Sequence, residues 1–80
     1  MSDSIPEAEL RDQLLKDNAE YRRLAAEHQS YDNQLEGLSN KNFLSEDEKL
    51  RERTLKKKKL LLKDRMYSMV QQYRKQIETG

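Results

Sequence analysis

The 80-residue chain contains no cysteine and no tryptophan, and it has one histidine, one proline and two glycines. Without cysteine, neither a disulfide nor a thiolate metal site can form, and one histidine argues against a histidine-rich metal centre. No run of about 20 apolar residues is present, so we expect no transmembrane segment. No charged start leads into an apolar segment as in a secretory signal, so we expect a cytoplasmic protein.

What the chain does contain is characteristic of long helices. Charged residues make up 39% of the sequence and hydrophobic residues 34%, with leucine, lysine, glutamate, arginine and glutamine abundant. Such a composition is typical of coiled coils and long helices rather than of a thick globular core. We therefore expect one all-α domain over residues 1–80, without a cofactor, a metal, a small-molecule substrate or a catalytic residue, and hence no enzyme.

The charges divide the chain into two halves of opposite sign. Residues 1–48 carry five Lys or Arg and twelve Asp or Glu, whereas residues 49–80 carry eleven and three. The halves therefore net −7 and +8, although the whole chain nets only +1. Opposite charges beside an apolar stripe favour antiparallel pairing of two helices. The charge division predicts an antiparallel two-helix hairpin that resembles a coiled coil.

Apolar spacing supports this hairpin, because steps of four and three residues alternate in both halves. In the first half the stripe comprises Leu10, Leu14, Asp17, Tyr21, Leu24, His28, Tyr31, Leu35 and Leu38, and in the second Leu55, Lys59, Leu62, Met66, Met69 and Tyr73. Folding the chain between the halves places Tyr21 opposite Leu62, Leu14 opposite Met69 and Leu10 opposite Tyr73. Val70 and Ile77 flank the second stripe.

Capping signals set the expected helix boundaries. Ser4 and Glu7 form a capping-box pattern around Pro6, which predicts a first helix over about 5–37. The polar pair at 17–18 allows a break there, which would leave a short extra N-terminal helix. Gly37 is the expected stop signal, followed by a loop over about 38–45. Ser45 and Glu48 form a second capping box, which predicts the second helix over about 46–76.

Several apolar residues lie off both stripes. They are Leu15 in the first helix and Leu60, Leu61 and Tyr67 in the second. A monomeric hairpin would leave part of this surface in water unless the N-terminal segment folds back over it. We expect these residues to contact a protein chain, either a second copy or another partner. This pattern predicts an interaction or scaffold module.

The lysines of the second half support an alternative. Lys56, Lys57, Lys58, Lys59 and Lys63 could contact nucleic acid or another polyanion. However, four consecutive lysines on a helix point in four directions, and no aromatic stacking platform or glycine-rich phosphate loop accompanies them. We therefore rank polyanion binding below a protein contact.

Two segments resemble the YdcH-like family, small bacterial proteins classed as a domain of unknown function. In the first, Tyr21 matches the family's aromatic residue, Leu24 its leucine, and His28 and Asp32 its polar pair, whereas Tyr31 stands where leucine is usual. In the second, the matching residues are Leu55, Lys56, Lys57, Lys59, Leu60, Leu62, Lys63 and Asp64. The resemblance covers about residues 20–70. It implies a helical hairpin without an assigned activity, and it supplies no catalytic residue.

Overall fold

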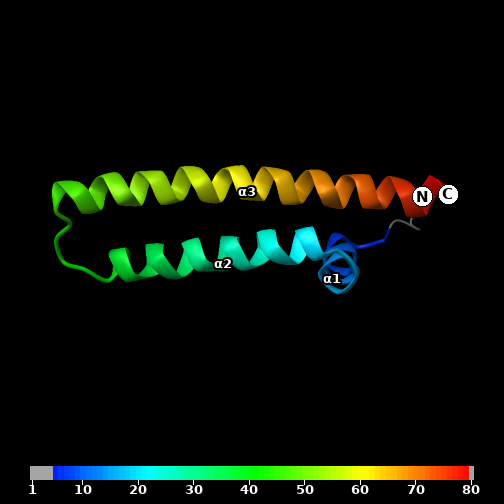
Figure 1. The fold of residues 1–80 in the computed structure, drawn as a ribbon, viewed down its shortest axis with the longest axis horizontal. Helices are drawn as coiled ribbons and strands as arrows, with labels where there is room; N and C mark the ends of the chain where they lie inside the picture. The colour runs from blue at the N-terminus through cyan, green and yellow to red at the C-terminus, as the bar shows by residue number, and fades with distance from the viewer. Residues whose placement is uncertain (1–4, 80) are drawn as a thin grey trace.

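The computed structural model describes residues 5–79 and contains three helices, with no strand among those residues. They are α1 (Glu7–Asp17), α2 (Ala19–Ser39) and α3 (Glu46–Thr79). Figure 1 shows α3 as one long rod, with α2 running alongside it in the opposite direction and α1 turned across the end of α2. A 34-residue helix is about 51 Å long, so α3 alone accounts for the 52 Å longest dimension. The expected all-helical class is confirmed.

One residue, Asn18, separates α1 from α2. Its extended backbone ends α1, with its N–H donating to the carbonyl of Leu14 (2.9 Å), while its side-chain oxygen accepts from the N–H of Tyr21 (2.9 Å). The guanidinium of Arg22 donates to the carbonyls of Leu15 and Lys16 at the end of α1. These carbonyls lack partners within the helix, and a cation there also suits the helix dipole. The break allowed at 17–18 is therefore present.

The first turn of α1 follows Pro6 directly. The carbonyl of Pro6 accepts backbone hydrogen bonds from Glu9 (3.0 Å) and Leu10 (3.2 Å). Proline suits this place because its missing N–H would have no partner in a first turn. The predicted cap Ser4 lies outside the described residues.

Gly37 does not end the first half of the hairpin, so that prediction is wrong. The glycine lies inside α2 without a positive φ, and the helix continues to Ser39. The hydroxyl of Ser39 and the backbone N–H of Asn40 both donate to the carbonyl of Glu36, at 3.0 and 3.2 Å. These bonds satisfy the last turn without the left-handed conformation for which glycine is usually needed. The connecting loop therefore spans residues 40–45.

The predicted cap of the second half is confirmed at the start of α3. The N–H of Ser45 donates to the carboxylate of Glu48 (3.0 Å), and the N–H of Glu48 donates to the hydroxyl of Ser45 (3.1 Å). The ammonium of Lys41, in the loop, also pairs with Glu48, and this contact together with the capping bond lowers the pKa of the Glu48 carboxyl to about 2. α3 then continues three residues beyond the expected end, to Thr79.

The best-packed core lies where all three helices meet. Leu10 and Leu14 of α1, Tyr21 of α2 and Val70 of α3 are buried together, with Met66, Met69, Tyr73 and Ile5 packed around them. Leu10 and Leu14 thus share a cluster with Met69 and Tyr73 as expected, although they reach it from a separate helix. Burial raises the pKa of the Tyr21 hydroxyl. Leu24, Leu38 and Leu55 are the further buried hydrophobic residues along the hairpin.

Charged side chains connect α2 and α3 along the exposed edges of the hairpin. Arg65 pairs with Glu20 (2.6 Å) and Lys59 pairs with Asp32, while Arg51 donates to the amide oxygen of Gln34 (3.1 Å). Exposed ion pairs contribute little to stability, so such pairs select the arrangement of the helices more than they stabilise it. None of the helices in residues 5–79 combines the length and apolar character needed to cross a bilayer.

Candidate functional site

One broad surface of α3 carries four large apolar side chains in water. Leu50, Leu60, Leu61 and Tyr67 are 61, 58, 65 and 58% exposed, and we call this surface the outer face. In the view of Figure 1, α1 and α2 both lie on the same side of α3, which leaves the other side of that helix without a neighbouring helix. Three of the four predicted protein-contact residues therefore lie on the outer face, and the hairpin leaves them uncovered.

The fourth predicted contact residue, Leu15, lies elsewhere. It is 38% exposed on α1 and lines a separate hollow with Ala8, Ala25 and Met66. Conversely, sequence reasoning missed Leu50, whose position eleven residues before Leu61 is three helical turns and hence the same face. It also missed Phe43, which is 88% exposed in the loop. Spacing could have revealed Leu50, but Phe43 carries no periodic signal.

The lysine run does not form one patch. Lys58 lines a hollow with Leu61 and Tyr31, Lys56 and Lys59 line another beside Asp32, and Lys63 lines a third with His28. This spread follows from the 100° between successive residues of a helix. Lys59 is paired with Asp32, whereas Lys56, Lys57 and Lys58 form no ion pair within residues 5–79.

The family-motif residues His28 and Asp32 meet Lys59 across the hairpin. His28 Nδ1 lies 3.5 Å from Asp32 Oδ2, and Asp32 Oδ1 accepts from the ammonium of Lys59. This hydrogen bond, with further help from the charge of Lys63, holds the pKa of the Asp32 carboxyl below its ordinary value. His28 Nε2 is buried and has no hydrogen-bond partner among the described residues. The trio ties α2 to α3.

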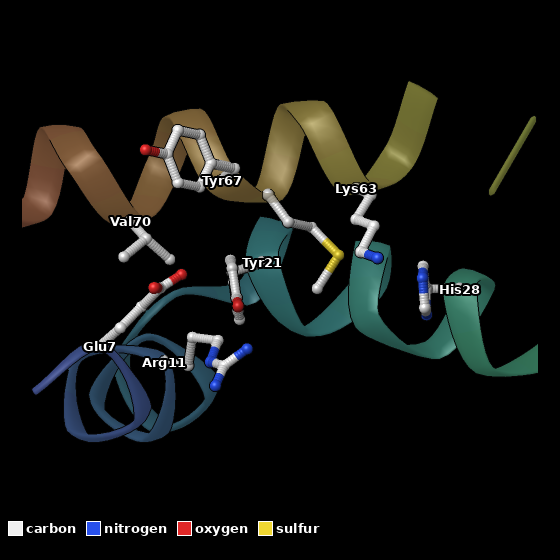
Figure 2. Close-up of a pocket in the computed structure, with 8 residues that line it drawn as sticks. Glu7, Arg11, Tyr21, His28, Lys63, Tyr67 and Val70 are labelled. Atoms are coloured by element: carbon white, nitrogen blue, oxygen red, sulfur yellow. The ribbon is translucent and has the colours of Figure 1, made fainter. Parts of the chain in front are cut away.

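A cavity of about 300 Å³ opens between the three helices. Figure 2 shows the residues that line it: Glu7 and Arg11 from α1, Tyr21 and His28 from α2, and Lys63, Met66, Tyr67 and Val70 from α3. Its wall is apolar beside Tyr21 and Val70 and charged at Glu7, Arg11 and Lys63. The cavity therefore continues the core towards the surface, with Tyr67 of the outer face at its edge.

Asp64, the last family-motif residue, is exposed on the outer face between Leu60 and Tyr67. Among residues 5–79 it forms no ion pair, and no three histidine, aspartate or glutamate side chains in that range group as metal ligands do.

Comparison with known proteins identifies a family but no activity. A family model described as a protein of unknown function, DUF465, matches residues 22–70, which comprise most of α2, the loop and most of α3. The match leaves out α1. No curated protein and no solved structure matches the chain. Because more than half of the chain matches, it belongs to the DUF465 family, an uncharacterised group of small domains that includes the YdcH-like proteins it resembles.

Proposed function

We propose that this chain is a coiled-coil-like helical scaffold that associates with a second copy of itself through the outer face of α3. The supporting observation is the exposure of Leu50, Leu60, Leu61 and Tyr67, each more than half exposed, on one side of a single helix. Several large apolar side chains exposed on one helix are a feature of interaction surfaces in small proteins. α1 and α2 both lie on one side of α3 (Figure 1), and the four side chains stay more than half exposed beside them, so a partner has access to the outer face.

The expected affinity is low. Burying a leucine side chain fully contributes about 1.5–3 kcal/mol. The monomer already covers part of each side chain of the outer face, so association gains only the remaining part of that free energy. Association costs at least about 4 kcal/mol of translational and rotational freedom. These magnitudes predict weak association, with a dissociation constant in the micromolar range or above.

Replacing Leu61 by glutamate is expected to abolish self-association. The substitution places a charge at the most exposed leucine of the outer face, where burial against another chain would leave it unpaired. Sedimentation velocity from about 5 to 500 µM measures the outcome, and circular dichroism checks the fold. Phe43→Glu is the matched control, because Phe43 is 88% exposed in the loop, away from the outer face. A wild-type chain that stays monomeric over this range would refute the proposal.

Polyanion binding is a second candidate, favoured by the exposure of Lys56, Lys57 and Lys58 without ion pairs in the described chain. Electrostatic affinity is strongest at low salt and falls steeply as salt rises. If this function holds, a duplex DNA probe at about 50 mM salt will shift on a gel, and Lys56→Glu with Lys58→Glu will weaken the shift at least tenfold. Absence of a shift at that salt concentration would remove this candidate.

A further inference from the structure

The centre of the outer face carries a charge arrangement that the folded monomer does not use. Four residues of α3 follow one another at spacings of three, one and three, namely Lys57, Leu60, Leu61 and Asp64. This spacing places them on one side of the helix. The two leucines lie in the middle, with a cation one turn before them and an anion one turn after them. All four side chains are exposed.

Asp64 is unusual for its surroundings. It is the sole acidic residue between Glu52 and Glu78, in a segment rich in lysine and arginine. Residues one turn away on a helix are the ones that form ion pairs, and around Asp64 these are Leu60, Leu61, Tyr67 and Ser68, none of which is charged. Lys57 likewise has no acidic residue three or four positions away. Neither side chain therefore has an ion partner within its own helix.

We propose that α3 pairs with α3 of a second copy in an antiparallel, two-fold symmetric dimer whose axis passes between Leu60 and Leu61. This inference rests on the proposed self-association and specifies its geometry. Lys57 and Asp64 are equally far from the axis on opposite sides. In an antiparallel pair, Lys57 of each copy therefore lies opposite Asp64 of the other, while the Leu60 and Leu61 side chains of both copies meet beside the axis.

Charge complementarity selects this arrangement over the alternatives. A parallel pair would place Lys57 against Lys57 and Asp64 against Asp64, which is repulsive at both positions. A two-fold axis makes each contact occur twice, so one complementary pair in the sequence becomes two in the dimer. Farther from the axis, Tyr67 lies opposite Thr54 of the second copy. Both residues are uncharged, so this pair adds no like-charge contact.

Charge reversal at these two positions tests the inference with the full-length chain. Asp64→Lys and Lys57→Asp are each expected to raise the dimer dissociation constant about tenfold, because two attractive contacts become two repulsive ones. Mixing the two variants is expected to restore the affinity, since every heterodimer contact is again between opposite charges. Sedimentation velocity measures the constants, and circular dichroism checks that both exposed substitutions leave the helices intact.

Two outcomes separate this inference from the broader proposal. If Leu61→Glu abolishes a wild-type dimer but the mixed charge variants associate no more tightly than either alone, the antiparallel pairing is wrong while self-association stands. If the wild-type chain is monomeric up to 500 µM, both fail. Restored affinity in the mixture, and in the double variant with both substitutions in one chain, supports the pairing, because purely non-specific apolar contact would not respond to the exchange of charges.

Discussion

Truncating Tyr21 to alanine is expected to lower the free energy of unfolding by about 3–5 kcal/mol. The side chain is 2% exposed and packs with Leu10, Leu14 and Val70, so its loss leaves a cavity where all three helices meet. Small domains have total stabilities of about 5–15 kcal/mol. The variant should therefore be largely unfolded or melt at a much lower temperature, which urea and thermal unfolding followed by circular dichroism will measure.

Two controls isolate the packing contribution. Tyr21→Phe keeps the ring and is expected to retain most of the stability. Tyr67→Ala removes the same side chain from a site that is 58% exposed, and it should change the free energy of unfolding by no more than about 0.5 kcal/mol in the monomer. Equal losses for Tyr21→Ala and Tyr67→Ala would contradict the position of the core.

Leu10→Ala is expected to cost about 2–5 kcal/mol and to act mainly on α1. Leu10 is 1% exposed, and besides Leu14 it is the only fully buried side chain that α1 contributes. An isolated helix of 11 residues is marginal in water, so α1 holds its structure by docking. Hydrogen exchange should show protection lost first over Glu7–Asp17, with α3 amides around Val70 affected less.

The matched control for this variant is Leu15→Ala on the same helix. Leu15 is 38% exposed, so its truncation should cost far less than that of its buried neighbours. If Leu10→Ala instead lowered protection uniformly along all three helices, α1 would unfold together with the hairpin, and the docked-helix description would fail.

Local sequence signals predicted much of the fold because the determinants are themselves local. Short patterns and charge account for the Ser45 and Glu48 cap, the break at Asn18 and the antiparallel run of α2 and α3. Gly37 misled because Ser39 and Asn40 provide hydrogen bonds that end the helix two residues later. A glycine therefore marks the end of a helix only when no later residue provides the hydrogen bonds that end it.

Tertiary features were harder to predict. Val70, expected only to flank the stripe, is 1% exposed because α1 turns across the hairpin and covers an additional side of α3. Leu15 was expected among the contact residues, yet the same turn of α1 places it in a hollow beside Met66, away from the outer face. Leu60, Leu61 and Tyr67 were predicted correctly as exposed, since each is one position, and hence about 100° around the helix, from a residue of the stripe.

The single-residue joint at Asn18 makes the N-terminal half intolerant of changes in length. Leu15 and Arg22 are seven residues apart, and the Arg22 guanidinium donates a hydrogen bond to the Leu15 carbonyl at the end of α1. This hydrogen bond depends on the number of residues between them. One inserted residue would turn everything before it by about 100° around the helix axis, carrying Leu10 and Leu14 off the core. Insertions and deletions should therefore accumulate in the loop around residues 42–44, which lies outside the helices, and be absent between Leu14 and Tyr21.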